Sequence, residues 1–68
     1  MNRVPVSSSN IKSIGYDNGT LEIEFNAGAV YQYSDVDVIT FNNLMEADSV
    51  GSFFTQNIKH SFQSKRIE

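Results

Sequence analysis

The side chains best suited to chemistry in this sequence are basic groups gathered near its C-terminal end. Lys59, His60, Lys65 and Arg66 all lie within residues 59–66, and Lys12 stands apart near the beginning. Lysine and arginine neutralise phosphates, and this contact supplies most of the affinity of proteins for nucleic acids. We therefore take these five residues as candidate nucleic-acid contacts.

The triplet Tyr31-Gln32-Tyr33 is the second candidate. Aromatic rings on a sheet can stack nucleic-acid bases while cations at the edge of the sheet hold the phosphates. This use requires exposed rings, because tyrosines that face the core contribute packing instead. The strand register decides between the two interpretations.

The residue types needed for common catalytic and metal sites are mostly absent. There is no cysteine and only one histidine, which excludes thiol nucleophiles, disulfides and His-His metal pairs. No serine stands in a nucleophile-elbow pattern, and isolated glycines cannot build a phosphate-binding loop. Glu22 and Glu24 could hold a cation or act as acid and base, but a solvated sheet face explains them without chemistry. We expect a non-enzymatic protein without catalytic residues, metal or cofactor.

Composition indicates a small globular domain. Of the 68 residues, 40% are hydrophobic and 19% are charged, and the net charge is −3. A chain of this size removes only about 60% of its surface from water on folding, so we expect marginal stability and self-association. No apolar stretch approaches the roughly 20 residues of a membrane span, and the sequence predicts a soluble, cytoplasmic protein without a membrane partner.

The first half of the chain predicts antiparallel strands. Residues 1–10 contain Pro5 and a run of three serines, which favours an extended arm or edge strand followed by a turn; a hydroxyl-lined ligand contact is the alternative for the serines. Residues 11–16 and 20–25 read as strands joined by Asn18-Gly19, a strong type I′ hairpin signal. This register places Tyr16 opposite Leu21 and leaves Glu22 and Glu24 on the other face.

The turn at residues 26–28 leaves two registers open. A three-residue loop with a left-handed Gly28 pairs Leu21 with Tyr33, so that both tyrosines join the apolar face. A two-residue loop shifts the register by one and sets both tyrosines beside Glu22 and Glu24. Glycine suits the bulged loop, whereas alanine is unfavourable at positive φ, and we favour the inward register.

Two helices are expected in the second half. Ser34 is the predicted cap of a helix over residues 35–48, with an apolar stripe that includes Val38 and Phe41, and Gly51 is its predicted stop. A shorter helix is expected over residues 52–62, and residues 63–68 are expected to fray. The predicted fold is α+β: a three-stranded antiparallel β-meander, four-stranded if the arm joins it, covered on one face by two C-terminal helices. Residues 11–68 would form the single domain.

The order and spacing of these segments resemble the KTSC domain. The matching segments are Ser8-Ser9-x-Ile11, Ile14-Gly15-Tyr16-Asp17, residues 21–25, Gly28-x-x-Tyr31-x-Tyr33, residues 48–54 and Ile58-Lys59. The family takes its name from the C-terminus of some lysyl-tRNA synthetases and also occurs as stand-alone bacterial or phage proteins; Tyr-x-Tyr is its signature. Two positions depart from the pattern: Asp37 replaces a helix-opening proline, and Val50 replaces a common lysine. The resemblance implies no defined activity, and RNA binding is a suggestion for this family rather than a demonstrated role.

Two functions remain open from the sequence. The first is a small binding or accessory module, with RNA, and tRNA in particular, as the ligand to test. The second is a homo-oligomeric structural or interaction protein, with or without a small nucleotide-like ligand at the subunit interface.

Overall fold

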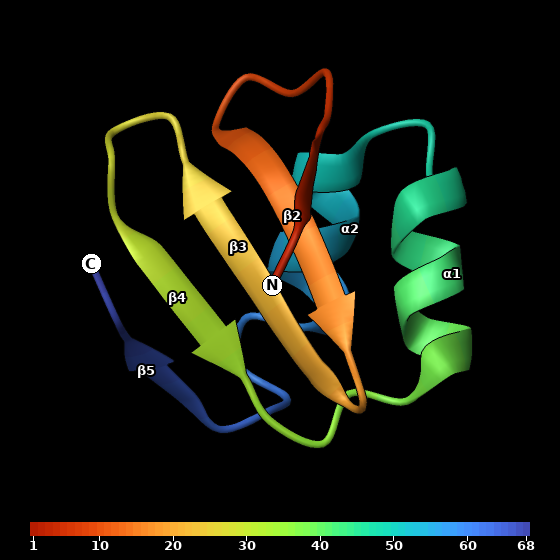
Figure 1. Cartoon of the computed structure of the whole chain (residues 1–68). Helices are drawn as coiled ribbons and strands as arrows, with labels where there is room; N and C mark the ends of the chain where they lie inside the picture. Colours follow the sequence, from red (N-terminus) through yellow and green to blue (C-terminus); the bar gives the residue numbers. More distant parts are fainter.

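A five-stranded antiparallel sheet forms the framework of the protein, as the computed structural model of residues 1–68 shows (Figure 1). The strands follow one another in space in the order of the chain, so the sheet is a simple meander. The elements are β1 (Arg3–Pro5), β2 (Ile11–Asp17), β3 (Thr20–Phe25), β4 (Val30–Tyr33), α1 (Val38–Glu46), α2 (Val50–Asn57) and β5 (Ser64–Arg66).

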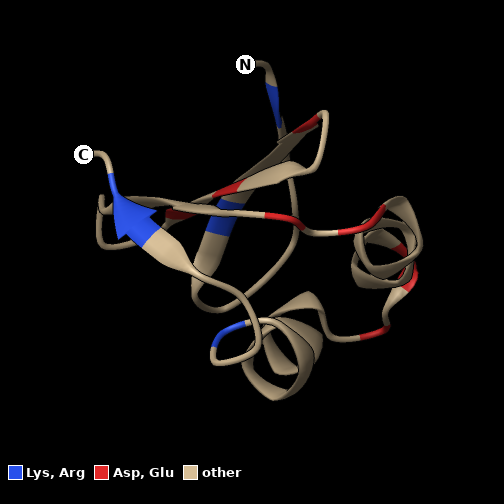
Figure 2. Cartoon of the chain, turned by 90° about the horizontal axis from the view of Figure 1, so that it is seen from below, with Lys and Arg blue, Asp and Glu red and all other residues tan.

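Both helices lie on one side of the sheet, and the two chain ends lie towards the other side (Figure 2). The α+β class and the single covered face are therefore as predicted. The strand number is not: the sheet has five strands rather than three or four. The N-terminal arm supplies one extra strand, with Pro5 at the edge where a missing backbone donor costs least. The C-terminal segment supplies the other.

The Asn18-Gly19 turn forms the predicted hairpin between β2 and β3. Both residues have positive φ, 50° and 86°, as a type I′ turn requires. Tyr16 pairs with Leu21, and Ile14 pairs with Ile23. The alternation of β3 therefore places its apolar side chains towards the helices.

The second turn adopts the inward register for the tyrosines. Gly28 has a φ of 107°, and its N–H donates to the carbonyl of Phe25 at 2.9 Å. Leu21 pairs with Tyr33, and Ile23 pairs with Tyr31. Glycine is suited to this position because a Cβ is unfavourable at such a φ, and this single residue places both tyrosine rings on the helix-covered face.

A single cluster of buried side chains joins the sheet to the helices. Nine residues form it: Ile11, Ile14, Leu21, Ile23, Tyr33, Val36, Leu44, Phe54 and Ile58. Leu44 is the buried residue of α1 and Phe54 that of α2. At the α1 side, Phe41 stacks on Tyr16 of β2 with ring centroids 4.4 Å apart, which joins this helix to the core.

Helix α1 begins later than predicted. Asp37, not Ser34, is the cap, and its carboxylate accepts hydrogen bonds from the backbone N–H and hydroxyl of Thr40, which lower the pKa of Asp37. Asp35 has a φ of 59°, so the helix cannot start before it. The predicted apolar stripe is also too long, because Val38 is 55% exposed.

Helix α2 begins earlier and ends earlier than predicted. Ser49 caps it by accepting from the N–H of Ser52 at 3.2 Å, so Gly51 lies inside this helix and does not stop the previous one. The helix ends at Asn57 rather than at residue 62. The chain then turns back and pairs with β4 as β5, with Tyr33 opposite Ser64, so the expectation that residues 63–68 fray is wrong.

Candidate functional site

A depression floored by aromatic rings lies where β4 and β5 meet the C-terminal half of α2. We call it the aromatic depression. Its cavity volume is about 540 Å³, within the range typical of small-ligand sites. Its lining residues are Asn10, Phe25, Tyr31, Tyr33, Phe54, Thr55, Lys59, His60 and Ser64.

The rings in the floor hold one another in place. Tyr33 meets Phe54 edge to face with centroids 5.3 Å apart, and Phe25 meets Tyr31 in the same way at 5.9 Å. The Tyr31 and Tyr33 rings lie 6.5 Å apart at an interplanar angle of 30°. Such edge-to-face contacts restrict ring rotation, so the depression presents a preformed aromatic surface. Tyr31 is half-buried, so one part of its ring packs against its neighbours and another part lines the depression.

The buried side chain of Tyr33 lines this depression. The residue is only 4% exposed, and every fully buried side-chain oxygen or nitrogen in the protein has a hydrogen-bond partner. No such partner exists for the Tyr33 hydroxyl within the chain, so that oxygen retains contact with solvent. Burial, with a smaller contribution from Tyr31, raises the pKa of Tyr33 above its ordinary value of 10.0. The hydroxyl therefore remains a neutral donor and acceptor.

Two of the five basic candidates line the aromatic depression, and a third lies opposite one of its tyrosines in the sheet. Lys59 and His60 follow α2 directly and line the cavity. Arg66 pairs with Tyr31 across the sheet, so its side chain leaves the strand on the same face as the Tyr31 ring. Its Nε donates to the Glu68 carbonyl at 2.9 Å, which leaves the two terminal nitrogens of the guanidinium for other contacts. We call Lys59, His60 and Arg66 the basic rim. Figure 2 shows basic positions at β5 and in the loop after α2, with others on β1 and β2, whereas acidic positions lie around α1 and on the strands.

The other two basic candidates lie elsewhere. Lys65 pairs with Gln32, which places it on the opposite face from Arg66. Lys12 is exposed at the irregularity between Ile11 and Ser13, where β2 holds one residue more than β3, and it lines no cavity. If residues 64–66 had been predicted as a strand, Lys65 and Arg66 would have been placed on opposite faces of the sheet. The polar composition of these residues gives no strand signal.

The face of the sheet without helices carries a closed polar network. Arg3 in β1 forms an ion pair with Glu22, and the amide of Gln32 donates to the other oxygen of the same carboxylate at 2.8 Å. Ser13 donates to Glu24 at 2.7 Å. The expectation of a solvated acidic face is therefore wrong for Glu22, which is 5% exposed.

The pKa of Glu22 is lowered from its ordinary value of 4.5. The hydrogen bond from Gln32 is the largest cause of its lowered pKa, and Arg3 contributes through a hydrogen bond and its charge, although burial opposes both. Because the lone pairs of this carboxylate already have partners, the pair Glu22 and Glu24 is committed to structure. No group of three histidine, cysteine or acidic side chains is placed to hold a metal ion.

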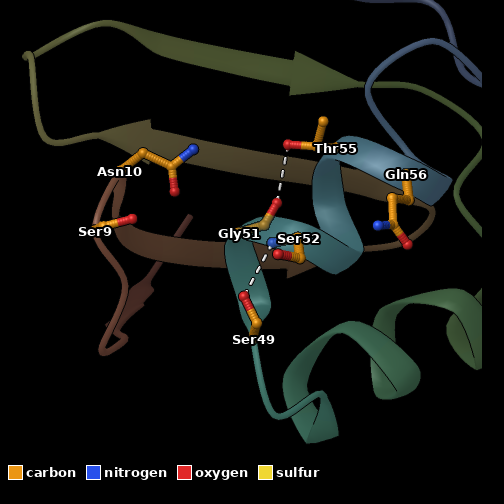
Figure 3. A pocket seen from close by; sticks show the side chains of 7 residues that line it. All are labelled: Ser9, Asn10, Ser49, Gly51, Ser52, Thr55 and Gln56. Atoms are coloured by element: carbon orange, nitrogen blue, oxygen red, sulfur yellow. Dashed lines mark hydrogen bonds between the residues drawn. The ribbon is translucent and has the colours of Figure 1, made fainter.

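A second depression lies between α2 and the loop that ends at Asn10, and Figure 3 shows the side chains that line it. We call it the hydroxyl shelf. Its cavity volume is about 360 Å³, and it has no hydrophobic lining residue. The lining residues are Ser9, Asn10, Ser49, Gly51, Ser52, Thr55 and Gln56. From the sequence, only the serine run at residues 7–9 suggested a hydroxyl-lined contact; its approach to α2 depends on the path of the chain.

Fold and site together define a small α+β domain with a preformed aromatic surface, a basic rim and an adjoining neutral shelf. No helix is both long and apolar enough to span a membrane. Residues 7–62 match the KTSC domain, so the chain belongs to the KTSC domain family.

Two proteins of known sequence and one solved structure are similar to most of the chain. An uncharacterised protein of Stutzerimonas stutzeri is 44% identical over 61 residues, covering 87% of this chain and 86% of the relative. A protein of Tsukamurella paurometabola is 37% identical over 62 residues, covering 88% and 92%. The crystal structure of a KTSC domain protein from Yersinia pestis superposes with a TM-score of 0.92 at 47% identity, covering 98% of this chain and 97% of that one.

Proposed function

We propose that this protein is a non-enzymatic binding module for RNA, with tRNA as the first ligand to test, and that the aromatic depression holds one unstacked base. The observation that carries the proposal is that Lys59 and His60 line the same cavity as the Tyr31 ring, while Arg66 lies opposite Tyr31 in the sheet. A base could lie against the aromatic surface while its phosphate meets the rim. Stacking of a base on an aromatic side chain contributes roughly 1–3 kcal/mol.

The charge distribution supports a local rather than an extended contact. The net charge of the whole chain is −3, which opposes general attraction of a polyanion. The basic positions at β5 and after α2 lie away from the acids around α1, so phosphate should be attracted more strongly at this end of the molecule (Figure 2). We therefore expect few phosphate contacts and a shallow dependence of affinity on salt.

The experiment is a titration of a labelled single-stranded RNA by fluorescence anisotropy at low and at physiological salt, followed by an unfractionated tRNA. Arg66→Gln should weaken binding and lower the salt slope by about one. Lys65→Gln is the matched control, because it removes the same charge from the neighbouring residue on the other face. Binding that is absent at low salt, or lost equally in both variants, would overturn the proposal.

Removal of the aromatic face tests the stacking contact separately. Tyr31→Leu keeps an apolar side chain against Phe25 but removes the ring, and we expect a loss of affinity of at least about fivefold at unchanged salt slope. An unchanged affinity for RNA would show that the Tyr31 ring packs against Phe25 and does not contact the ligand.

Self-association is the second candidate, and one observation favours it. Val38 and Ile39 are exposed side by side at the start of α1, at 55% and 67%. An apolar pair in that position would gain from burial against a second copy. Light scattering over a concentration series tests this: a strict monomer at high concentration excludes it.

A further inference from the structure

The aromatic depression and the hydroxyl shelf are parts of one surface. Asn10 and Thr55 line both of them. Asn10 lies at the end of the loop before β2, and Thr55 lies on α2, so the junction is formed by two segments distant in sequence (Figure 3). A ligand seated on the aromatic rings can therefore continue past these two residues onto the shelf.

We infer that this continuous track binds a single-stranded RNA segment of more than one nucleotide, and that the hydroxyl shelf contacts its ribose hydroxyls. The inference rests on the proposed RNA binding and adds the form of the ligand: single-stranded, extended, and ribose rather than deoxyribose.

The two parts of the track differ in charge. The aromatic depression includes Lys59 and His60 and lies beside Arg66. The shelf has no charged side chain: apart from Gly51 it offers four hydroxyls and two amides. Neutral groups cannot neutralise a phosphate, but they donate to and accept from a ribose 2′-hydroxyl, the group that distinguishes RNA from DNA.

Several of these polar groups are free to meet a ligand. Within the shelf, the Ser49 hydroxyl accepts the cap hydrogen bond, and the Thr55 hydroxyl donates to the Gly51 carbonyl at 2.9 Å. The hydroxyl of Ser52 and the amide of Gln56 have no partner in the chain, and both side chains are exposed. These two groups therefore remain available on the same exposed face of α2.

Gly51 controls how closely the loop approaches the helix. A Cβ at this position would lie 2.5 Å from Oδ1 of Asn10 and 3.1 Å from Oγ of Ser8. Glycine therefore allows Asn10 to sit against α2 at the junction of the two depressions. Its backbone is helical, so an alanine here would not strain the helix and would move Asn10 instead.

The test compares four probes on the full chain: uridine monophosphate, a labelled oligouridylate of six nucleotides, the matched deoxyuridine oligomer, and the same RNA held in a duplex. The single-stranded RNA should bind about fivefold more tightly than its deoxy form, and more tightly than the monophosphate or the duplex. The double variant Ser52→Ala with Gln56→Ala should remove the preference for ribose while the affinity for the deoxy oligomer stays within about twofold.

Gly51→Ala provides an independent variant. It should weaken binding of the six-nucleotide RNA by a larger factor than binding of the monophosphate, because only the longer ligand passes the junction at Asn10. Equal affinity for ribose and deoxyribose oligomers, or an oligomer no tighter than the monophosphate, would overturn the inference and leave RNA binding intact. Failure of every probe to bind would overturn the proposed function itself. Circular dichroism of each variant shows that the fold is retained.

Discussion

The two faces of the sheet use polar side chains in opposite ways. On the open face, Arg3, Glu22 and Gln32 bond to one another and leave few groups for a ligand. On the helix-covered face, Tyr31 and the basic rim border an unfilled depression. Both faces come from the same strands, whose alternate side chains point in opposite directions.

The difference indicates where binding can occur. A buried carboxylate must be paired, because a buried charge left without its partner destabilises the fold. On the open face, the polar groups therefore bond to one another and hold β1 to the sheet. The covered face gains its stability from apolar packing, so its polar groups at the edge remain available.

The largest effect should come from the core beneath the aromatic depression. Phe54 is 2% exposed and contacts the rings of Phe25 and Tyr33. Phe54→Ala should lower the free energy of unfolding by about 3–5 kcal/mol, a large part of the stability of so small a domain. Urea unfolding followed by circular dichroism measures it. Ile39→Ala, at an exposed position, is the control and should change stability by no more than about 0.5 kcal/mol. Similar values for both would contradict the assigned core.

A smaller effect should come from the open face. Arg3→Ala leaves Glu22 without its cation and should cost about 1.5–3 kcal/mol in the same assay. If the variant is as stable as the parent, β1 is not held by this ion pair.

The same network predicts a dependence of stability on acid pH. Because the pKa of Glu22 is lowered in the folded state, its ionised form stabilises the protein above the ordinary value of 4.5, and this stabilisation is lost as the pH falls through the lowered pKa. Glu22→Gln should therefore flatten the fall in stability below pH 4.5. Glu46→Gln, at an exposed position on α1, is the matched control; equal flattening in both variants would contradict the assignment to Glu22.

The smallest effect on stability should come from the ionisation of Tyr33 at high pH. Its raised pKa favours the neutral phenol, so one tyrosine should titrate above pH 10.0, and the stability linked to it should fall as the pH rises further. Ultraviolet difference absorbance of tyrosinate measures this step. Tyr33→Phe should remove the late step, and Tyr16→Phe should retain it. If a titration step above pH 10.0 persists in Tyr33→Phe, the tyrosine with the raised pKa is a different one.

Local rules predicted the parts of the fold that depend on neighbouring residues. Asn18-Gly19 specified one hairpin and Gly28 the register of the next, because each turn requires a positive φ that few residues adopt. The class of fold and the side of the sheet that receives the tyrosines followed from these turns. Helix boundaries were less certain, because Ser34, Asp37 and Ser49 are all suitable caps and only the backbone at Asp35 excludes the first.

The sequence by itself determined the family, the register of the central strands and the face on which Tyr31 and Tyr33 lie. Only the tertiary structure decided that residues 64–66 form a strand beside β4, that Arg3 pairs with Glu22, and that Asn10 and Thr55 line the same cavity. Each of these contacts joins segments far apart in the chain. Such contacts depend on the path of the whole chain and on which polar groups need partners, and neither can be read from local residue types. Gly28 placed the aromatic rings, and the return of β5 placed Arg66 beside them.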